Sequence, residues 1–259
     1  MLQSELEAIY MMWLRQLKRF LRSKSRVLSA VIRPLFFLVI LGSGLRATMS
    51  GNILEGDYLT FLAPGIVGMA ILFSSMFTGI SVIWDKQFGF LQEVLVAPIS
   101  RFSIIIGRTL GGATIALIQG LLILFIALLL QININSNIFQ LILALVIMVL
   151  VAFATVGFGL VLSTRIQDFQ GFQIIMTLVI MPLLFSSSAF FPIANNPSLP
   201  DIVVQLSYFN PLFYMIDGIR GSLTGVNYVL DPIYNFLVVL GLCIFMMALG
   251  GYLFNRSEM

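Results

Sequence analysis

The sequence contains no histidine and only one cysteine, Cys243, among its 259 residues. Without histidine the chain lacks the commonest general base and the commonest metal ligand, and a single cysteine can form neither an internal disulfide nor a cysteine metal cluster. Charge is also scarce, because Asp, Glu, Lys and Arg together make up 10% of the residues. Soluble domains carry about 25%, so the composition excludes a single water-soluble domain.

Apolar residues take the place of the missing charge, at 59% of the chain and a mean hydropathy of +1.05. They occur in long runs, whereas the strands of a membrane β-barrel alternate apolar and polar residues. The sequence therefore predicts an all-α polytopic membrane protein with six transmembrane helices of about 20 residues each. We expect these helices near residues 28–48, 59–83, 106–130, 139–163, 171–190 and 233–254.

The first of these runs contains Arg33 followed by Pro34. Proline is tolerated in the first turn of a helix, so we expect the well-formed part of this span to begin there. A basic amphipathic segment, residues 4–24, precedes the run, with apolar residues at helical spacing and one tryptophan among them. This pattern is typical of a helix lying in the membrane interface, and a solvated basic tail is the alternative.

Positive charge orients the six spans. With the N-terminus in the cytoplasm, every Lys and Arg except Arg46 and Arg220 lies on the cytoplasmic side, as the positive-inside rule requires. We therefore expect a multi-pass protein with both termini in the cytoplasm.

Two segments between the spans are too apolar for free loops. The cytoplasmic stretch 84–105 suggests a short helix with one apolar face, which either lies on the membrane or forms a joint with a soluble partner. The outer stretch 187–232 contains five prolines and long apolar runs. We expect it to form one or two short helices that dip back into the outer leaflet and pack on the spans.

An energy source is missing from the chain. It has no GxxxxGK[ST] phosphate-binding loop and no pair of acids in the middle of a span, so neither nucleotide binding of that kind nor a proton relay is indicated. The uncharged interior of the spans suggests an amphipathic or lipid-linked substrate. These absences leave transport or assembly that is driven by a partner protein as the expected function. A non-transporting membrane scaffold or sensor that works with an ATPase is the alternative function.

Three local patterns carry a resemblance to the type-2 ABC exporter permeases. They are YLTFLAPGI at Tyr58–Ile66, LQEVLVAPISRFSIIIGR at Leu91–Arg108 and NPLFYMIDGIRGSL at Asn210–Leu223. The resemblance covers nearly the whole chain, although Phe191 and Pro192 stand where the family signature usually has small residues.

The resemblance implies a single transmembrane domain over residues 1–259, with an interfacial helix at 4–24, a cytoplasmic coupling segment at 85–101 and outer re-entrant helices within 187–232. It implies the permease subunit of an ATP-driven exporter in a prokaryotic plasma membrane. The expected partners are two ABC-class ATPase subunits, which carry ATP and Mg, a second permease copy in a homodimer or heterodimer, and membrane lipid. The chain itself is then no enzyme and needs no cofactor, metal or nucleic acid.

Two sets of site residues follow from the resemblance. The expected ATPase coupling interface consists of Asp85, Phe88, Phe90, Leu91, Glu93, Ala97, Pro98 and Arg101. Its charged residues are expected to pair with the ATPase or to be solvated, and its aromatic residues to contact the ATPase or lipid. The expected outer gate helix contains Pro211, Tyr214, Asp217 and Arg220. Asp217 and Arg220 are three residues apart, so they share a helix face, which favours a local ion pair over a direct part in substrate release.

Overall fold

The computed structural model describes residues 2–49, 54, 56–89, 100–135, 137–166, 168–193, 196 and 199–256. The elements in these ranges are helical, which confirms the all-α prediction. They are α1 (Leu2–Arg22), α2 (Lys24–Met49), α3 (Tyr58–Gln87), α5 (Arg101–Leu129), α6 (Ile138–Arg165), α7 (Phe169–Ile175), the π-helical η1 (Met176–Ile180), α8 (Met181–Phe185), α9 (Asp201–Tyr208), α10 (Pro211–Thr224) and α11 (Pro232–Arg256).

Five helices among the described residues, α2, α3, α5, α6 and α11, are long and apolar enough to cross a membrane. They coincide with five of the six predicted spans. The remaining predicted span, 171–190, corresponds to the shorter apolar segment Phe169–Phe185, which consists of α7, η1 and α8. At 1.5 Å per residue this segment extends about 25 Å, slightly less than the thickness of a bilayer core.

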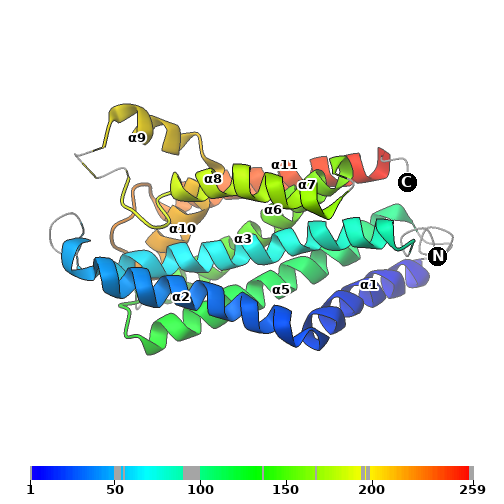
Figure 1. Cartoon of the computed structure of the whole chain (residues 1–259), viewed down its shortest axis with the longest axis horizontal. Coiled ribbons are helices and arrows are strands. Elements are labelled where there is room, and N and C mark those ends of the chain that lie inside the picture. The colour runs from blue at the N-terminus through cyan, green and yellow to red at the C-terminus, as the bar shows by residue number, and fades with distance from the viewer. Residues whose placement is uncertain are drawn as a thin grey trace.

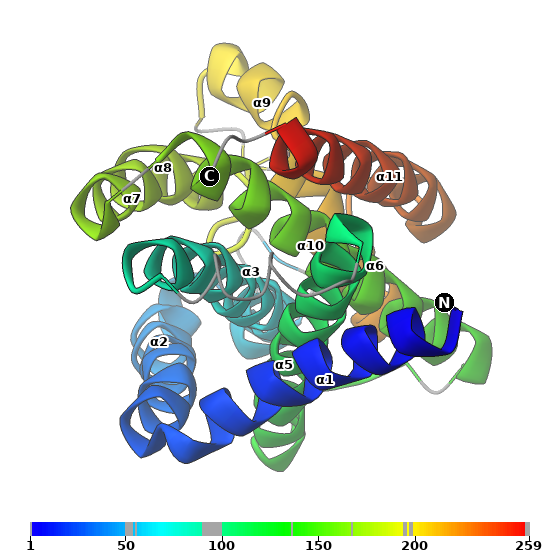
Figure 2. The ribbon, with the colours of Figure 1, turned by 90° about the vertical axis from the view of Figure 1, so that its right-hand side faces the viewer.

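Helix α3 forms the centre of the bundle. It lies between α2, α5, α6 and the α7–α8 segment (Figure 2). Of the 18 residues in its most apolar stretch, 89% are buried. In the corresponding stretches of α2 and α11, only 17% of the residues are buried. A helix that is apolar on all sides is stable in the interior of a protein, whereas the outer helices present apolar faces that an apolar surrounding must cover.

Glycine allows the helices around α3 to approach closely. A Cβ atom on Gly79 of α3 would collide with the backbone of Gly159 of α6, and one on Gly65 with the backbone of Ala189. Small residues at crossings of this kind let helix backbones touch where no hydrophobic effect drives association.

Helix α2 begins at Lys24, ten residues before Pro34, so the expectation that the helix starts at Arg33 and Pro34 was wrong. Tertiary contacts explain the earlier start. The guanidinium carbon of Arg26 lies 5.4 Å from the ring centre of Phe77, and that of Arg33 lies 5.8 Å from the ring centre of Phe73, both on α3. These contacts hold the turns before the proline against α3, although the proline removes one helical hydrogen bond.

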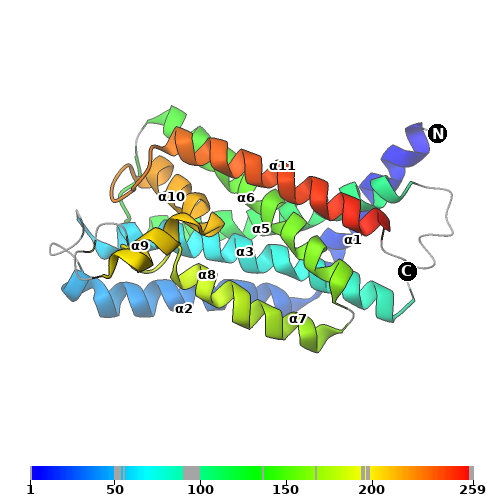
Figure 3. The same cartoon turned by 90° about the horizontal axis from the view of Figure 1, so that it is seen from above.

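The two ends of the bundle differ. Helix α1, the C-terminal end of α11 and both chain termini lie at one end, which we call the basic end (Figure 1). The helices α9 and α10 lie together at the opposite end, which the sequence analysis expects to face outward and which we call the outer end (Figure 3). They are the two short helices expected within residues 187–232. The short helix expected within 84–105 cannot be placed, because residues 90–99 lie outside the described residues.

Candidate functional site

Two consecutive residues at the C-terminal end of α3, Trp84 and Asp85, join this helix to its neighbours at the basic end. Asp85 is 4% exposed, and its carboxylate accepts a 2.7 Å hydrogen bond from Nη2 of Arg108 on α5. It also accepts hydrogen bonds of 3.2 Å from both terminal nitrogens of Arg15 and from Arg19, which belong to α1. Asp85 therefore ties α1 and α5 to α3.

The indole of Trp84 connects α3 to two more helices, α7 and α2. Its ring stacks on Phe169 of α7 with 5.9 Å between the ring centres. The guanidinium carbons of Arg19 on α1 and Arg26 on α2 each lie 5.5 Å from the same ring, within the range of cation–π attraction. We call this set the Trp84–Asp85 junction. It consists of Trp84, Asp85, Arg15, Arg19, Arg26, Arg108 and Phe169.

The ion pair of Asp85 with Arg108 is the buried part of the junction. The Arg108 side chain is fully buried, and its Nε and Nη1 atoms have no hydrogen-bond partner within the described residues. A buried ion pair adds little net stability, but removing one member leaves an uncompensated charge and costs about 3–5 kcal/mol. Arg108 therefore depends on Asp85 for its only hydrogen-bonded counterion in the described structure.

Helix α1 is fixed to α5 along its length. Cβ atoms on Gly107 and Gly111 of α5 would collide with α1, so the two backbones touch there. At the start of α5, the carboxylate of Glu5 accepts hydrogen bonds from the backbone N–H and the hydroxyl of Ser100, at 3.0 and 2.9 Å. The Ser100 hydroxyl in turn caps the helix by accepting from the backbone N–H of Ser103. Hydrogen bonds from the hydroxyls of Ser103 and Ser100 lower the pKa of Glu5 below its usual value.

The structure places three of the eight residues expected in the coupling interface. Asp85 directs its carboxylate to the chain's own arginines. Phe88 follows the last turn of α3 and is 82% exposed, and Arg101 is exposed at the first position of α5. Phe90, Leu91, Glu93, Ala97 and Pro98 lie outside the described residues.

The sequence analysis did not foresee the internal partners of Asp85. One signal pointed to them: Arg15 and Arg19 are four residues apart and so share a face of the N-terminal helix. Two arginines on a face that packs against the bundle require an acid nearby, because buried charges are paired.

At the outer end, α10 carries a second buried acid and arginine, Asp217 and Arg220, whose side chains are fully buried and 4.0 Å apart. Each makes its hydrogen bonds elsewhere. Asp217 accepts from the backbone N–H groups of Val229 and Leu230 at 3.0 and 2.9 Å and from the side-chain amide of Asn235 at 2.9 Å. These bonds fix α10 to the turn that leads into α11.

Arg220 fixes the same helix to α3. Its Nε donates to the carbonyl of Phe61 at 3.2 Å and its Nη2 to the carbonyl of Ser188 at 2.6 Å. The guanidinium carbon also lies 3.9 Å from the ring centre of Phe61. Arg220 therefore connects α10 with the centre of the bundle and with the turn that follows α8.

The other two residues expected in the gate helix lie at the start of α10. Pro211 occupies its first turn, and the hydroxyl of Tyr214 donates to the carbonyl of Tyr208 on α9 at 2.8 Å. Asn210, which the sequence analysis missed, caps the helix and also donates to the carbonyl of Leu183 on α8. Its position directly before a proline was the available signal, because asparagine favours the N-cap and proline the first helical position.

Comparison with known proteins places the chain among transport permeases. The family described as ABC-2 type transporter matches residues 7–224. The putative transport permease ycf38 of Cyanophora paradoxa is 30% identical over 206 residues, which are 78% of this chain and 70% of that protein. The inner membrane transport permease YadH of Escherichia coli K12 is 27% identical over 85% of this chain and 84% of its own length. Nodulation protein J of Rhizobium leguminosarum is 28% identical over 85% of this chain and 81% of its own length.

Proposed function

Because the chain belongs to the ABC-2 type transporter family and is a multi-pass transmembrane permease, we propose that it forms the translocation pathway of an ATP-driven exporter. Two separate ABC-class ATPase subunits, which bind and hydrolyse ATP with Mg, drive it. A second permease copy, identical or homologous, completes the pathway. The protein lies in a prokaryotic plasma membrane with both termini in the cytoplasm, and the α7–η1–α8 segment makes the sixth crossing.

The Trp84–Asp85 junction is the observation that carries this proposal. It lies at the start of the coupling segment 85–101, and through it α3 contacts α1, α2, α5 and α7. A displacement of the segment by the ATPase subunits therefore pulls on five helices together. A pathway opened from the cytoplasmic side requires such a rigid connection between the docking segment and the spans.

The exposed Phe88 supports docking at this place. It stands directly after α3 with 82% of its surface accessible, beside Gly89, which adopts a positive φ of 74° and so ends the helix. A large aromatic side chain at the edge of a helix end fits a pocket on a soluble partner. Phe90 and Leu91, with Glu93, extend the same interface along the segment, together with Ala97, Pro98 and Arg101.

The outer helices α9 and α10 act as the exit gate in this proposal. Asp217 and Arg220 hold α10 to α11 and α3, so a relative movement of these spans moves the gate helix. The exported substrate is amphipathic or lipid-linked in this proposal, because the candidate spans are strongly apolar, with mean hydropathies of 2.0 to 2.9 over their most apolar stretches.

Co-purification with an ABC ATPase encoded beside the gene tests the proposal. The wild type, Glu93→Ala and the triple variant Phe88→Ala/Phe90→Ala/Leu91→Ala are compared in nanodiscs for complex formation and ATP turnover. Phe102→Ala is the matched control, because Phe102 is 69% exposed but lies outside the segment. We expect the triple variant to lose the complex or its ATP turnover and the control to keep both.

Two outcomes contradict the proposal. If no ATPase binds, or if the substitutions in residues 85–101 do not change binding, the energy source lies elsewhere. If the complex forms but no amphipathic compound changes its ATP turnover or crosses the membrane, the chain is the membrane subunit of a scaffold or sensor.

A further inference from the structure

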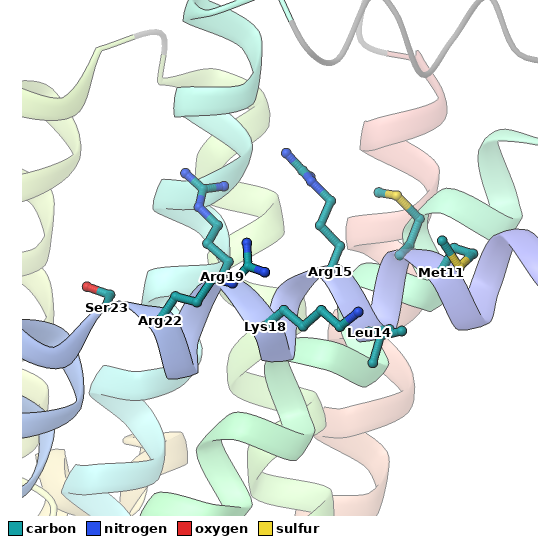
Figure 4. Close-up of a pocket in the computed structure, with 8 residues that line it drawn as sticks. Met11, Leu14, Arg15, Lys18, Arg19, Arg22 and Ser23 are labelled. Atoms are coloured by element: carbon teal, nitrogen blue, oxygen red, sulfur yellow. The ribbon is translucent and has the colours of Figure 1, made fainter.

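A cavity of about 750 Å³ lies along one side of α1 at the basic end (Figure 4). Its described lining residues all belong to this helix and its C-terminal neighbour: Met11, Met12, Leu14, Arg15, Lys18, Arg19, Arg22 and Ser23. Three apolar side chains toward the start of the helix are followed by four basic ones, and none of these described lining residues is acidic. A cavity of this chemistry fits an amphiphile with an anionic head group.

Among the described residues, the lining of the cavity carries four cations and no carboxylate. Lys18 and Arg22 are exposed and form no ion pair with any carboxylate in the described part of the chain. Arg15 and Arg19 both contact the carboxylate of Asp85, which also binds Arg108. The shortest of these contacts, 2.7 Å, goes to Arg108, and the other two measure 3.2 Å. Charge-assisted hydrogen bonds are ordinarily about 2.7–2.9 Å long, so the contact of Asp85 with Arg108 is the tightest of these.

An apolar strip of α1 runs beside these cations. Leu6, Tyr10 and Leu21 are 62%, 55% and 66% exposed. At 100° per residue Tyr10 and Leu21 lie within about 80° of Lys18 on the helix circumference, and Leu6 lies farther round. The face with the buried Met12 and Gln16 packs against α5. Adjacent apolar and cationic strips, both uncovered by the protein, are typical of a helix at the level of phospholipid head groups.

We propose that the cavity on α1 is a binding site for the phosphate of an anionic phospholipid. Lys18 and Arg22 contact the phosphate directly, and Met11 and Leu14 contact the glycerol and the upper acyl chains. Because Arg15 and Arg19 line the same cavity and also bind Asp85, a bound phosphate shares these two arginines with the Trp84–Asp85 junction. Lipid composition thereby acts on the junction through its arginines. The site requires only that the chain lies in a membrane and not that an ATPase drives it.

The test uses the full chain, purified in detergent without any ATPase. Binding of phosphatidylglycerol and phosphatidylcholine is measured by native mass spectrometry and by the shift in thermal unfolding. The variant Lys18→Gln/Arg22→Gln removes two cations that form no ion pair with an acid in the described ranges, so the Asp85 contacts stay intact. Arg165→Gln/Arg256→Gln is the matched control, because both residues are exposed at the basic end but lie outside the cavity.

We expect the wild type and the control to prefer phosphatidylglycerol. The Lys18→Gln/Arg22→Gln variant loses affinity for it by about fivefold for each cation, or about 30-fold in total, and binds phosphatidylcholine as the wild type does. Unchanged unfolding of the variant in phosphatidylcholine shows that it is folded.

Three results overturn the proposal. Equal binding of the two lipids by the wild type shows that the cavity does not select an anion from the membrane, and points to an acidic protein surface as its occupant. An equal loss in the Arg165→Gln/Arg256→Gln control shows a diffuse charge effect without a site. Protection by inorganic phosphate at the same phosphate concentration shows a site for the free ion. The ATPase co-purification above is unaffected by any of these results, so the two proposals fail separately.

Discussion

The two ends of this permease each bury an aspartate beside an arginine, but they bond them differently. At the basic end, the hydrogen bonds that Asp85 receives from described residues all come from guanidinium groups, with Arg108 at 2.7 Å. At the outer end, Asp217 and Arg220 are 4.0 Å apart, and each bonds mainly to backbone groups of other elements. The same residue pair thus serves as a junction between helices at one end and as an anchor for one helix at the other.

The difference follows from what each partner can do when helices move. Two long arginine side chains on α1 can follow Asp85 through small shifts of α3, because their stems are flexible. Backbone N–H and C=O groups cannot follow, so α10 stays fixed to its neighbours unless several bonds break together. We infer that movement enters the bundle at the basic end and is passed on at the outer end as the displacement of a rigid helix.

The largest effect is expected from Arg220→Ala. This change leaves the carbonyls of Phe61 and Ser188 without their donor and Asp217 without the nearest cation, all in a fully buried site. We expect a loss of about 3–5 kcal/mol in the free energy of unfolding, measured by thermal unfolding in detergent. Arg220→Lys keeps the charge but cannot make both hydrogen bonds, so it should fall between the wild type and the alanine variant. Wild-type stability in Arg220→Ala would show that the anchor is unimportant.

Asp85→Ala should cause the second largest loss in the free energy of unfolding, near the lower end of the same range of about 3–5 kcal/mol. It leaves Arg108 buried without a counterion, but Arg15 and Arg19 are 30% and 31% exposed and can turn to water. The double variant Asp85→Ala/Arg108→Met should recover most of the loss, because it removes the unpaired charge as well. If the two residues were not coupled, the loss in the free energy of unfolding of the double variant would equal the sum of the losses of the two single variants.

Asp217→Asn should lower the free energy of unfolding less than Asp85→Ala does. Asparagine retains one acceptor oxygen for the backbone N–H groups of Val229 and Leu230, but it loses the second acceptor and the charge. We expect a loss of about 1–3 kcal/mol, with faster hydrogen exchange at residues 226–231. Exchange rates unchanged in this turn would mean that the carboxylate does not hold it.

The smallest effect concerns the contact of α1 with the start of α5 and depends on pH. Hydrogen bonds from Ser103 and Ser100 lower the pKa of Glu5, so the carboxylate stabilises the folded state above the pKa of the unfolded chain. That contribution is lost as the pH falls through the lowered folded pKa, which lies below the usual pKa of glutamate. Fluorescence of Trp13, whose indole N–H donates to Thr114 on α5, should report the loosening. Glu5→Gln should show no such change over this range, and an identical titration in that variant would contradict the assignment.

The membrane-spanning helices were largely predictable from the sequence. Five of the six expected spans are helices of sufficient length, because a bilayer requires long apolar helices whatever their neighbours are. The start of α2 was not predictable from local rules. The rule for Pro34 describes an isolated helix, and contacts of Arg26 and Arg33 with aromatic residues of α3 override it.

The sequence analysis singled out residues of the candidate site but did not indicate the bonds that they make. The sequence located the segment around Asp85 and the helix with Asp217 and Arg220. It did not indicate that Asp85 turns inward to the chain's own arginines, or that Asn210 and Asn235 complete the fixation of α10. These contacts depend on how the helices are rotated about their axes, which close approaches at residues such as Gly79 and Gly111 determine.

The sequence by itself determined the helical class, the apolar spans and the asymmetry of positive charge, because each of these depends on the solvent and on neighbours along the chain. Only the tertiary structure decided which acid meets which arginine. Arg15 and Asp85 are 70 residues apart in the chain, and Arg220 and Phe61 are 159 apart. Contacts at such separations exist only after the helices have packed, since the packing of backbones sets which side chains come within hydrogen-bonding distance.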